Sequence, residues 1–231
     1  MARPHEDRER HTLVDHRPGG MPVTFAAGAW CALELAAVEA TRTDAALSAY
    51  ETLVEKAHTS AAKAGPAAIL RSTNGRRVIV LLEVEGHVAF RHVAAAWDDH
   101  HLEAEHRAVA ESGSLALYRL DVVAGEAAID PGTHDAYAFE RVARAADKVR
   151  AVLPSLEAAD GFRGALLFGL DDAETANGGA AILYRFTDAQ HFDAFRASAT
   201  ALQYLGPIGE TGETVHAVHP VKTFTGEAVA G

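Results

Sequence analysis

Residues 67–84, AAILRSTNGRRVIVLLEV, place an Asn-Gly dipeptide between two apolar runs. Asparagine and glycine adopt backbone conformations with positive φ more easily than other residues, so this arrangement is typical of a β-hairpin. We therefore expect two antiparallel strands joined by a type I′ turn at Asn74-Gly75. The following strand, Val78–Val84, is apolar at successive positions, which predicts that both faces of its sheet are covered.

The same pattern recurs about half a chain later. The only other asparagine, Asn177, is also followed by glycine, lies 103 residues beyond Asn74, and is flanked by the apolar runs of residues 162–172 and 178–186. Two shorter landmarks recur at spacings of 101 and 105 residues: Gly-Glu-Ala at 125–127 and 226–228, and Phe-Arg at 90–91 and 195–196. Because these landmarks keep the same order and nearly the same spacing, we predict a duplicated unit.

Each predicted hairpin is flanked by further elements in the same order. Apolar residues at helical spacing precede the hairpins at Thr43–Ala64 and Arg141–Ala158, and Pro154 is expected to kink or end the second of these helices. A further helix follows each hairpin, at His87–Val109 and Asp188–Ala201. Strands are expected to begin and end the units at residues 30–40, 114–127, 135–142 and 214–228. The order β-α-β-β-α-β predicts an α+β fold of two ferredoxin-like repeats.

These elements define three segments of the chain. Residues 1–22 are charged and have few apolar side chains, so we expect a flexible N-terminal arm. The first ferredoxin-like repeat is expected at 23–130 and the second at 131–231.

Composition excludes several classes of function. The chain of 231 residues has a net charge of −11 and no Lys/Arg cluster, which argues against nucleic-acid binding. The chain lacks an apolar run of about 18 residues, so no membrane span is expected. A single cysteine, Cys31, excludes an internal disulfide and favours the cytoplasm. No nucleophile elbow or phosphate-binding glycine motif occurs, and we predict no metal site.

Taken together, the repeats, their length and the stretch ILYRFTDAQHFDAFRAS (182–198) resemble the dimeric α+β barrel superfamily, and within it the antibiotic biosynthesis monooxygenase family. The resemblance covers residues 24–228. It implies that two sheets close into one α+β barrel with the helices outside. It also implies an enzyme of bacterial secondary metabolism, a cofactor-independent monooxygenase or cyclase that acts on an aromatic, polyketide-like small molecule as a monomer or homodimer. Val84 and Phe186 stand where some family members carry a catalytic tryptophan.

A second reading of the same resemblance stays open. Chlorite dismutase-like haem proteins also carry two such repeats in one chain, and this chain has thirteen histidines. The alternative to a cofactor-free enzyme is therefore a haem-binding or non-catalytic member of the fold.

The stretch WDDHHLEAEH (97–106) contains the densest group of proton-transfer side chains. Phe90, Trp97 and His101 fall on one helical stripe that should face the sheet, where the resembling family holds its substrate. We predict His101 as the general base, with His100 in its place if the helix phase differs by one residue. A core histidine bonded to a backbone carbonyl is the structural alternative for His101.

Further residues complete the predicted site. Tyr118, on the last strand of the first repeat, is expected to hydrogen-bond a substrate oxygen, and Trp97 to supply a flat apolar wall. Phe90, Tyr184 and His216 are predicted as additional substrate-binding residues. The corresponding stripe of the second repeat is apolar and is expected to be plain core: Phe192, Phe195, Ala199 and Leu202.

Overall fold

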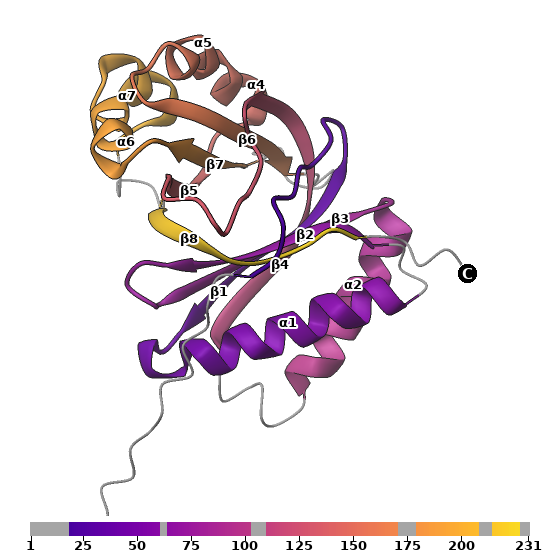
Figure 1. Cartoon of the computed structure of the whole chain (residues 1–231). Helices are drawn as coiled ribbons and strands as arrows, with labels where there is room; N and C mark the ends of the chain where they lie inside the picture. Colours follow the sequence, from indigo (N-terminus) through magenta and orange to yellow (C-terminus); the bar gives the residue numbers. More distant parts are fainter. Residues whose placement is uncertain (1–18, 61–63, 103–109, 171–178, 208–213, 227–231) are drawn as a thin grey trace, which may run out of the picture.

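The computed structural model of the chain describes residues 19–60, 64–102, 110–170, 179–207 and 214–226. Within these ranges, antiparallel strands form a closed barrel in the order β1-β3-β2-β8-β5-β7-β6-β4 (Figure 1). The strands are β1 (Trp30–Val38), β2 (Ala64–Ser72), β3 (Arg77–Val84), β4 (Ala110–Gly125), β5 (Ala136–Val142), β6 (Phe162–Leu170), β7 (Ala180–Phe186) and β8 (Thr214–Phe224). The helices lie outside the barrel, as expected for an α+β barrel.

The barrel consists of two halves with the same strand order. The first half reads β4-β1-β3-β2 and the second reads β8-β5-β7-β6. Two antiparallel seams join them, one between β2 and β8 and one between β4 and β6. One chain therefore supplies both sheets of the barrel.

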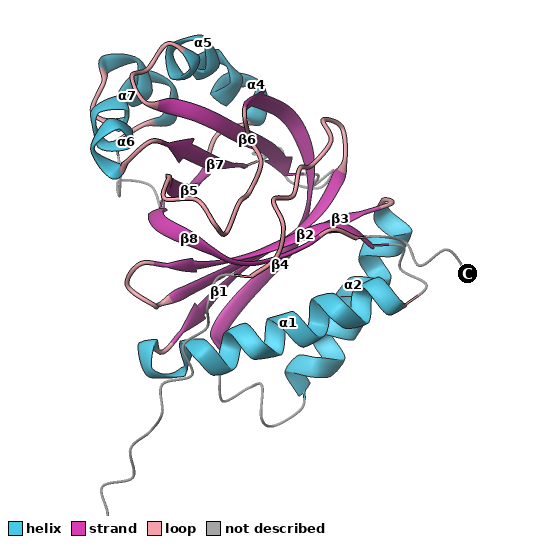
Figure 2. Cartoon of the chain, in the orientation of Figure 1, coloured by secondary structure: helices cyan, strands magenta, loops and turns pink. Residues whose placement is uncertain are grey.

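Helices cover the outer face of each half (Figure 2). The first half carries η1 (Ala40–Arg42), α1 (Thr43–Thr59) and α2 (His87–Leu102). The second half carries α4 (Ala146–Val149), η2 (Arg150–Val152), α5 (Leu153–Glu157), α6 (Ala189–Arg196) and α7 (Ala199–Leu205). Among the described residues, no helix is long and apolar enough to cross a membrane.

Buried side chains form three cores. One packs α1 and α2 against the first half, one fills the barrel interior with residues of both halves, and one packs α4–α7 against the second half. Successive residues of β3 alternate between cores, with Val80 toward the helices and Ile79 and Leu81 inside the barrel. Both faces of this strand are covered, as the apolar run predicted. Burial of each side chain of this size stabilises the folded state by about 1.5–3 kcal/mol.

The helical region that precedes the second hairpin differs from the prediction. Arg141 and Val142 belong to strand β5, where they pair with β7, so the helix does not begin at residue 141. The remaining segment breaks into α4, η2 and α5, and Pro154 lies in the first turn of α5. A proline is favourable in the first turn of a helix and unfavourable further inside it, so the break precedes Pro154.

The predicted apolar stripe of the second repeat is also broken. Phe192 and Phe195 are buried, but Leu202 is 44% exposed. Ser198 begins a new helix there, because its side chain accepts a hydrogen bond from the backbone nitrogen of Ala201. The stripe is not wholly apolar either, since Arg196 is buried in the same core.

The first hairpin forms at the predicted dipeptide with a longer connection. Residues 73–76 link β2 and β3, so the connection is not a two-residue type I′ turn. Gly75 adopts a φ of +68° and donates its backbone N–H to the Ser72 carbonyl over 2.9 Å. Asn177-Gly178, the second predicted turn, lies outside the described residues.

The N-terminal segment closes one end of the barrel. Gly19 pairs with β8, and the hydroxyl of Thr223 donates to the carbonyl of Met21 over 2.7 Å, so residues 19–22 of the predicted arm are bound to the barrel. Val23 and Phe25 are buried in the interior core, at the end where β1 and β5 begin. Residues 1–18 lie outside the described part of the chain.

Candidate functional site

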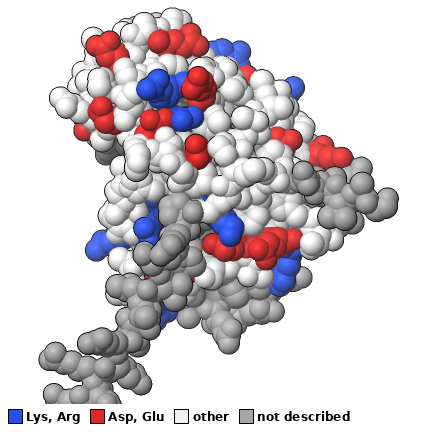
Figure 3. Space-filling model, viewed as in Figure 1, with Lys and Arg blue, Asp and Glu red and all other residues white. Residues whose placement is uncertain are grey.

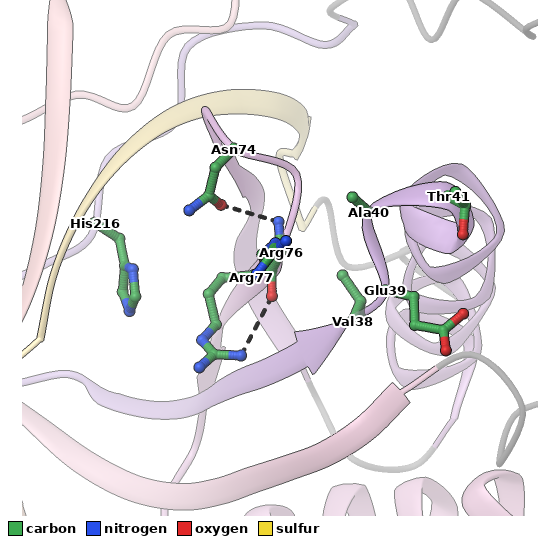
Figure 4. Close-up of a pocket in the computed structure, with 8 residues that line it drawn as sticks. All are labelled: Val38, Glu39, Ala40, Thr41, Asn74, Arg76, Arg77 and His216. Atoms are coloured by element: carbon green, nitrogen blue, oxygen red, sulfur yellow. Dashed lines mark hydrogen bonds between the residues drawn. The ribbon is translucent and has the colours of Figure 1, made fainter.

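A cavity of about 530 Å³ lies at the other end of the barrel, where β1 ends and β3 begins. The end of β1 with η1, the β2–β3 connection and β8 contribute its walls (Figure 4). The lining residues are Val38, Glu39, Ala40, Thr41, Asn74, Arg76, Arg77 and His216. His216 is the member of this set that the sequence predicted as substrate-binding.

Strand alternation explains why two polar side chains meet here. Side chains two residues apart in a strand point to the same face. Ile79 faces the barrel interior, so Arg77 faces the same space at the open end of β3. Val218 also faces the interior, and His216 therefore does so from β8. The interior is filled by apolar side chains deeper down and becomes polar at this opening.

Hydrogen bonds hold the arginine-bearing connection in place. The Oδ1 atom of Asn74 accepts from the Ser72 hydroxyl over 2.8 Å and from the backbone nitrogen of Arg76 over 3.0 Å. The backbone nitrogen of Arg77 donates to the Ser72 Oγ over 2.9 Å. Thr43 at the start of α1 donates its hydroxyl to the Gly75 carbonyl. The two guanidinium groups thus extend from a well-anchored loop.

The cavity has an excess of positive charge. In the described part of the chain, neither Arg76 nor Arg77 lies within ion-pair distance of a carboxylate. The acidic lining residue, Glu39, is already paired with Arg42 at 3.1 Å. Two guanidinium groups therefore have no carboxylate partner in the part of the chain that the structure describes, although the whole chain has a net charge of −11.

His216 lies beside these charges with a buried, unused nitrogen. Its Nε2 atom is buried and has no hydrogen-bond partner among the described residues. Burial first, and then the positive charge of Arg77, lower the pKa of His216 below its ordinary value of 6.5. The imidazole is therefore neutral at pH 7 and can accept a proton.

The predicted pair Trp97 and Tyr118 does not line one cleft. Trp97 is buried in the core between the helices and the first half, with its ring centroid 6.4 Å from that of Tyr50. Phe90 packs against the same core. Tyr118 faces the barrel interior on the other side of the sheet, because its neighbour Leu117 takes the helix-facing position.

The predicted base cannot be placed from its side chain. His100 and His101 lie on α2, but their side chains fall outside the described residues. The roles assigned to them stay predictions.

Tyr118 has a charged partner, Arg141, on β5. Burial raises the pKa of its hydroxyl, while the charge of Arg141 and a hydrogen bond with Arg141 lower it by less. Arg141 follows Phe139 by two residues on β5 and is therefore on the same face of the strand, but it is exposed. Tyr118 is not part of the cavity lining.

Tyr184 belongs to a buried polar cluster in the outer core of the second half. Its hydroxyl donates to Glu140 over 2.9 Å, and Arg196 donates to the other oxygen of Glu140 over 2.8 Å. Burial, followed by the charge of Glu140, raises the pKa of Tyr184. The first half has a related contact, in which Tyr50 donates to Glu34 over 2.8 Å. Each first strand thus carries a buried glutamate, and Tyr184, which binds one of them, is not part of the cavity lining.

The sequence reasoning missed the cavity arginines. The segment Asn-Gly-Arg-Arg was interpreted only as a turn, although two adjacent arginines at a strand start were a visible signal. Only barrel closure brings them to His216.

No group of three or more metal-ligating side chains occurs among the described residues. On the face in Figure 3, acidic and basic side chains are interspersed.

Comparison with known proteins places the chain by its fold. No protein-family model and no curated protein sequence matches it. An anthrone oxidase-like protein of known structure is similar, with a TM-score of 0.68 and 11% identity over 89% of this chain and 97% of the other.

Two further structures share the arrangement. A candidate monooxygenase of Fusobacterium nucleatum has a TM-score of 0.53 and 12% identity, covering 87% of this chain and 96% of its own. A chlorite dismutase variant of Candidatus Nitrospira defluvii has a TM-score of 0.51 and 10% identity, covering 85% and 93%. At these identities the likeness shows the fold alone. The chain shares the α+β barrel fold of these structures, with both halves of the barrel in one chain.

Proposed function

We propose that the protein is an enzyme that oxidises an aromatic small molecule with molecular oxygen in the cavity at the open barrel end. The observation that carries this proposal is His216 beside Arg77, with its buried Nε2 lacking a hydrogen-bond partner among the described residues. The similarity to an anthrone oxidase-like protein and to a candidate monooxygenase supports the same class of reaction. The two halves are tandem ferredoxin-like repeats in this proposal, and no bound cofactor is required.

The cavity is large enough for such a substrate. Sites for drug-sized ligands are about 300–1,000 Å³, and this cavity is about 530 Å³. Val38 and Ala40 supply apolar wall, while Arg76 and Arg77 supply positive charge.

The residues present suit oxidation of a methylene group between two aromatic rings. His216 accepts a proton from the methylene or its enol, and the hydrogen-bond donors of the cavity wall stabilise the oxyanion that forms. The electron-rich anion adds molecular oxygen to give a peroxide, which takes its proton from the imidazolium. Loss of the second methylene hydrogen then expels water. One oxygen atom becomes the carbonyl and the other leaves in that water, so atoms and electrons balance.

Oxygen consumption with anthrone as substrate tests the proposal. We expect one oxygen molecule consumed for each ketone formed, and no product under argon. His216→Gln should lower kcat by about 10²- to 10⁴-fold, the usual contribution of a general base. His219→Gln is the matched control, because His219 is exposed on the opposite face of β8.

Several outcomes would contradict this function. A chain that oxidises neither anthrone nor related phenols is not such an oxygenase, and unchanged turnover in His216→Gln would remove His216 from the mechanism. Product formed equally fast without oxygen would instead identify a cyclase.

The similarity to a chlorite dismutase variant supports haem binding as the alternative function. The cavity offers His216 as a candidate ligand beside the apolar side chains of Val38 and Ala40. We derive no step through haem. A haemin titration checks this directly, since an intense stoichiometric shift of the Soret band would show a haem site.

A further inference from the structure

We propose that the cavity at the open barrel end holds its substrate by a carboxylate group bound to Arg76 and Arg77. The proposal deepens the function above and rests on it for the identity of the site. It names the chemical class of substrate, an aromatic carboxylic acid.

The first argument is the charge of the walls. Arg76 and Arg77 both line the cavity, and no described carboxylate lies within ion-pair distance of either. Glu39 does not compensate them, because Arg42 already binds its carboxylate at 3.1 Å. A concave site with two guanidinium groups that have no carboxylate partner among the described residues attracts an anion.

The second argument is the supply of hydrogen-bond donors. The Oδ1 atom of Asn74 is occupied by Ser72 and Arg76, which leaves its amide nitrogen as a donor. In Figure 4 this nitrogen lies on the side of the loop that faces His216. Thr41 adds a hydroxyl to the same walls. The cavity therefore offers many donors, and its ligand should supply acceptor oxygens.

The third argument selects a carboxylate among oxyanions. A planar guanidinium group matches the two oxygens of a carboxylate or of a phosphate. Val38 and Ala40 give the same cavity apolar wall, which suits an organic acid better than a free inorganic anion. The chain's charge of −11 also disfavours ligands with several negative charges.

The fourth argument is the coupling between this anion site and His216. The charge that acts on His216 is that of Arg77 on β3. Arg76 and Glu39 also line the cavity, and Arg71 on β2 is paired with Asp44 at 3.7 Å. Arg77 acts against protonation of His216. A carboxylate on Arg77 compensates that charge, so ligand binding raises the pKa of His216 and makes it a stronger base.

Benzoate is the probe, with benzamide as its neutral counterpart. Imidazole NMR signals of the full chain are titrated with pH, and the His216 signal is assigned by its loss in His216→Gln. We expect benzoate to raise the pKa of His216 and benzamide to leave it unchanged. Arg77→Gln should raise this pKa without any ligand and abolish the benzoate effect.

Binding affinity supplies a second measurement. Calorimetric titration should show benzoate binding weakened at least about tenfold by Arg76→Gln and by Arg77→Gln, which is the loss expected for a charge-assisted hydrogen bond. Arg163→Gln is the control, because Arg163 is an exposed arginine on β6 outside the cavity lining. Circular dichroism confirms that each variant is folded.

Equal binding of benzamide and benzoate would overturn the proposal, and so would unchanged benzoate affinity in the double variant Arg76→Gln/Arg77→Gln. Phosphate and chloride that bind as tightly as benzoate would also overturn it, because the cavity would then hold an adventitious ion only. These measurements need no turnover. Benzoate binding without oxidation of anthrone or of an anthrone carboxylic acid would therefore defeat the proposed oxidase alone, and His216-dependent oxidation without benzoate binding would defeat the carboxylate site alone.

Discussion

At the scale of single residues, His216 differs from the exposed His219 on the same strand only through its surroundings. The two side chains are three positions apart, so they point to opposite faces of β8. The inward face brings His216 next to Arg77 and buries its Nε2. The difference between the two histidines therefore follows from the face of the strand on which each lies and not from residue type.

The lowered pKa of His216 predicts a pH dependence of stability. The unfolded chain binds a proton near pH 6.5, whereas the folded chain does so only at lower pH. The unfolded state therefore holds more protons in this window, and the free energy of unfolding falls as the pH drops below 6.5. Between pH 7 and 5, the free energy of unfolding measured with urea should fall less steeply in His216→Asn than in the wild type. His219→Asn should keep the wild-type slope, and equal slopes in all three proteins would contradict the assignment.

At the scale of elements, the β2–β3 connection serves both fold and cavity. Gly75 with its positive φ lets the chain reverse, and the next two residues are the cavity arginines. Asn74 uses its side-chain oxygen to hold Arg76. A hairpin that the sequence indicates for structural reasons therefore also positions charge at the barrel opening.

Gly75→Ala should destabilise the protein by about 1 kcal/mol, because a residue with Cβ is strained in the left-handed region. Space is not the cause, since the nearest side-chain atom to the added Cβ would be Thr43 Oγ1 at 3.4 Å, an ordinary contact. Gly179→Ala is the control: its φ is not positive and its nearest neighbour is also at 3.4 Å. Denaturant unfolding measures both variants, and equal stability of the two would show that Gly75 carries no strain.

At the scale of the whole molecule, neither half can complete its own core. The interior core combines Leu33 and Ile79 of the first half with Phe139 and Leu166 of the second. The seams β2–β8 and β4–β6 also satisfy strand edges that would otherwise be open. The barrel should therefore fold as one unit.

Residues 24–130 expressed alone should be insoluble or self-associated, because the interior face and two strand edges lose their partners. Size-exclusion chromatography with light scattering measures this, and co-expression of residues 131–231 should restore a soluble one-to-one complex. A stable monomer of residues 24–130 that unfolds cooperatively would show that the halves are independent.

Local sequence determined much of the fold. The Asn74-Gly75 turn, the start of α1 at Thr43 and the start of α2 at His87 follow from turn chemistry and apolar periodicity, which act over a few residues. The predicted boundaries of helices and strands were wrong where partners distant in the sequence determine the structure. Arg141 and Val142 joined a strand because β7 pairs with them, and the stripe after Phe195 ended because Ser198 caps a new helix.

The candidate site, by contrast, was decided by tertiary structure. The sequence singled out His216 and Tyr118 by type, but it could not say that Arg77 would lie beside His216, since those residues come from different halves of the chain. It also could not foresee that Trp97 and Tyr118 would face different cores. Periodicity determines which side chains share a face of one element. Only closure of the barrel determines which faces meet, because that depends on pairing between β2 and β8, strands far apart in the sequence.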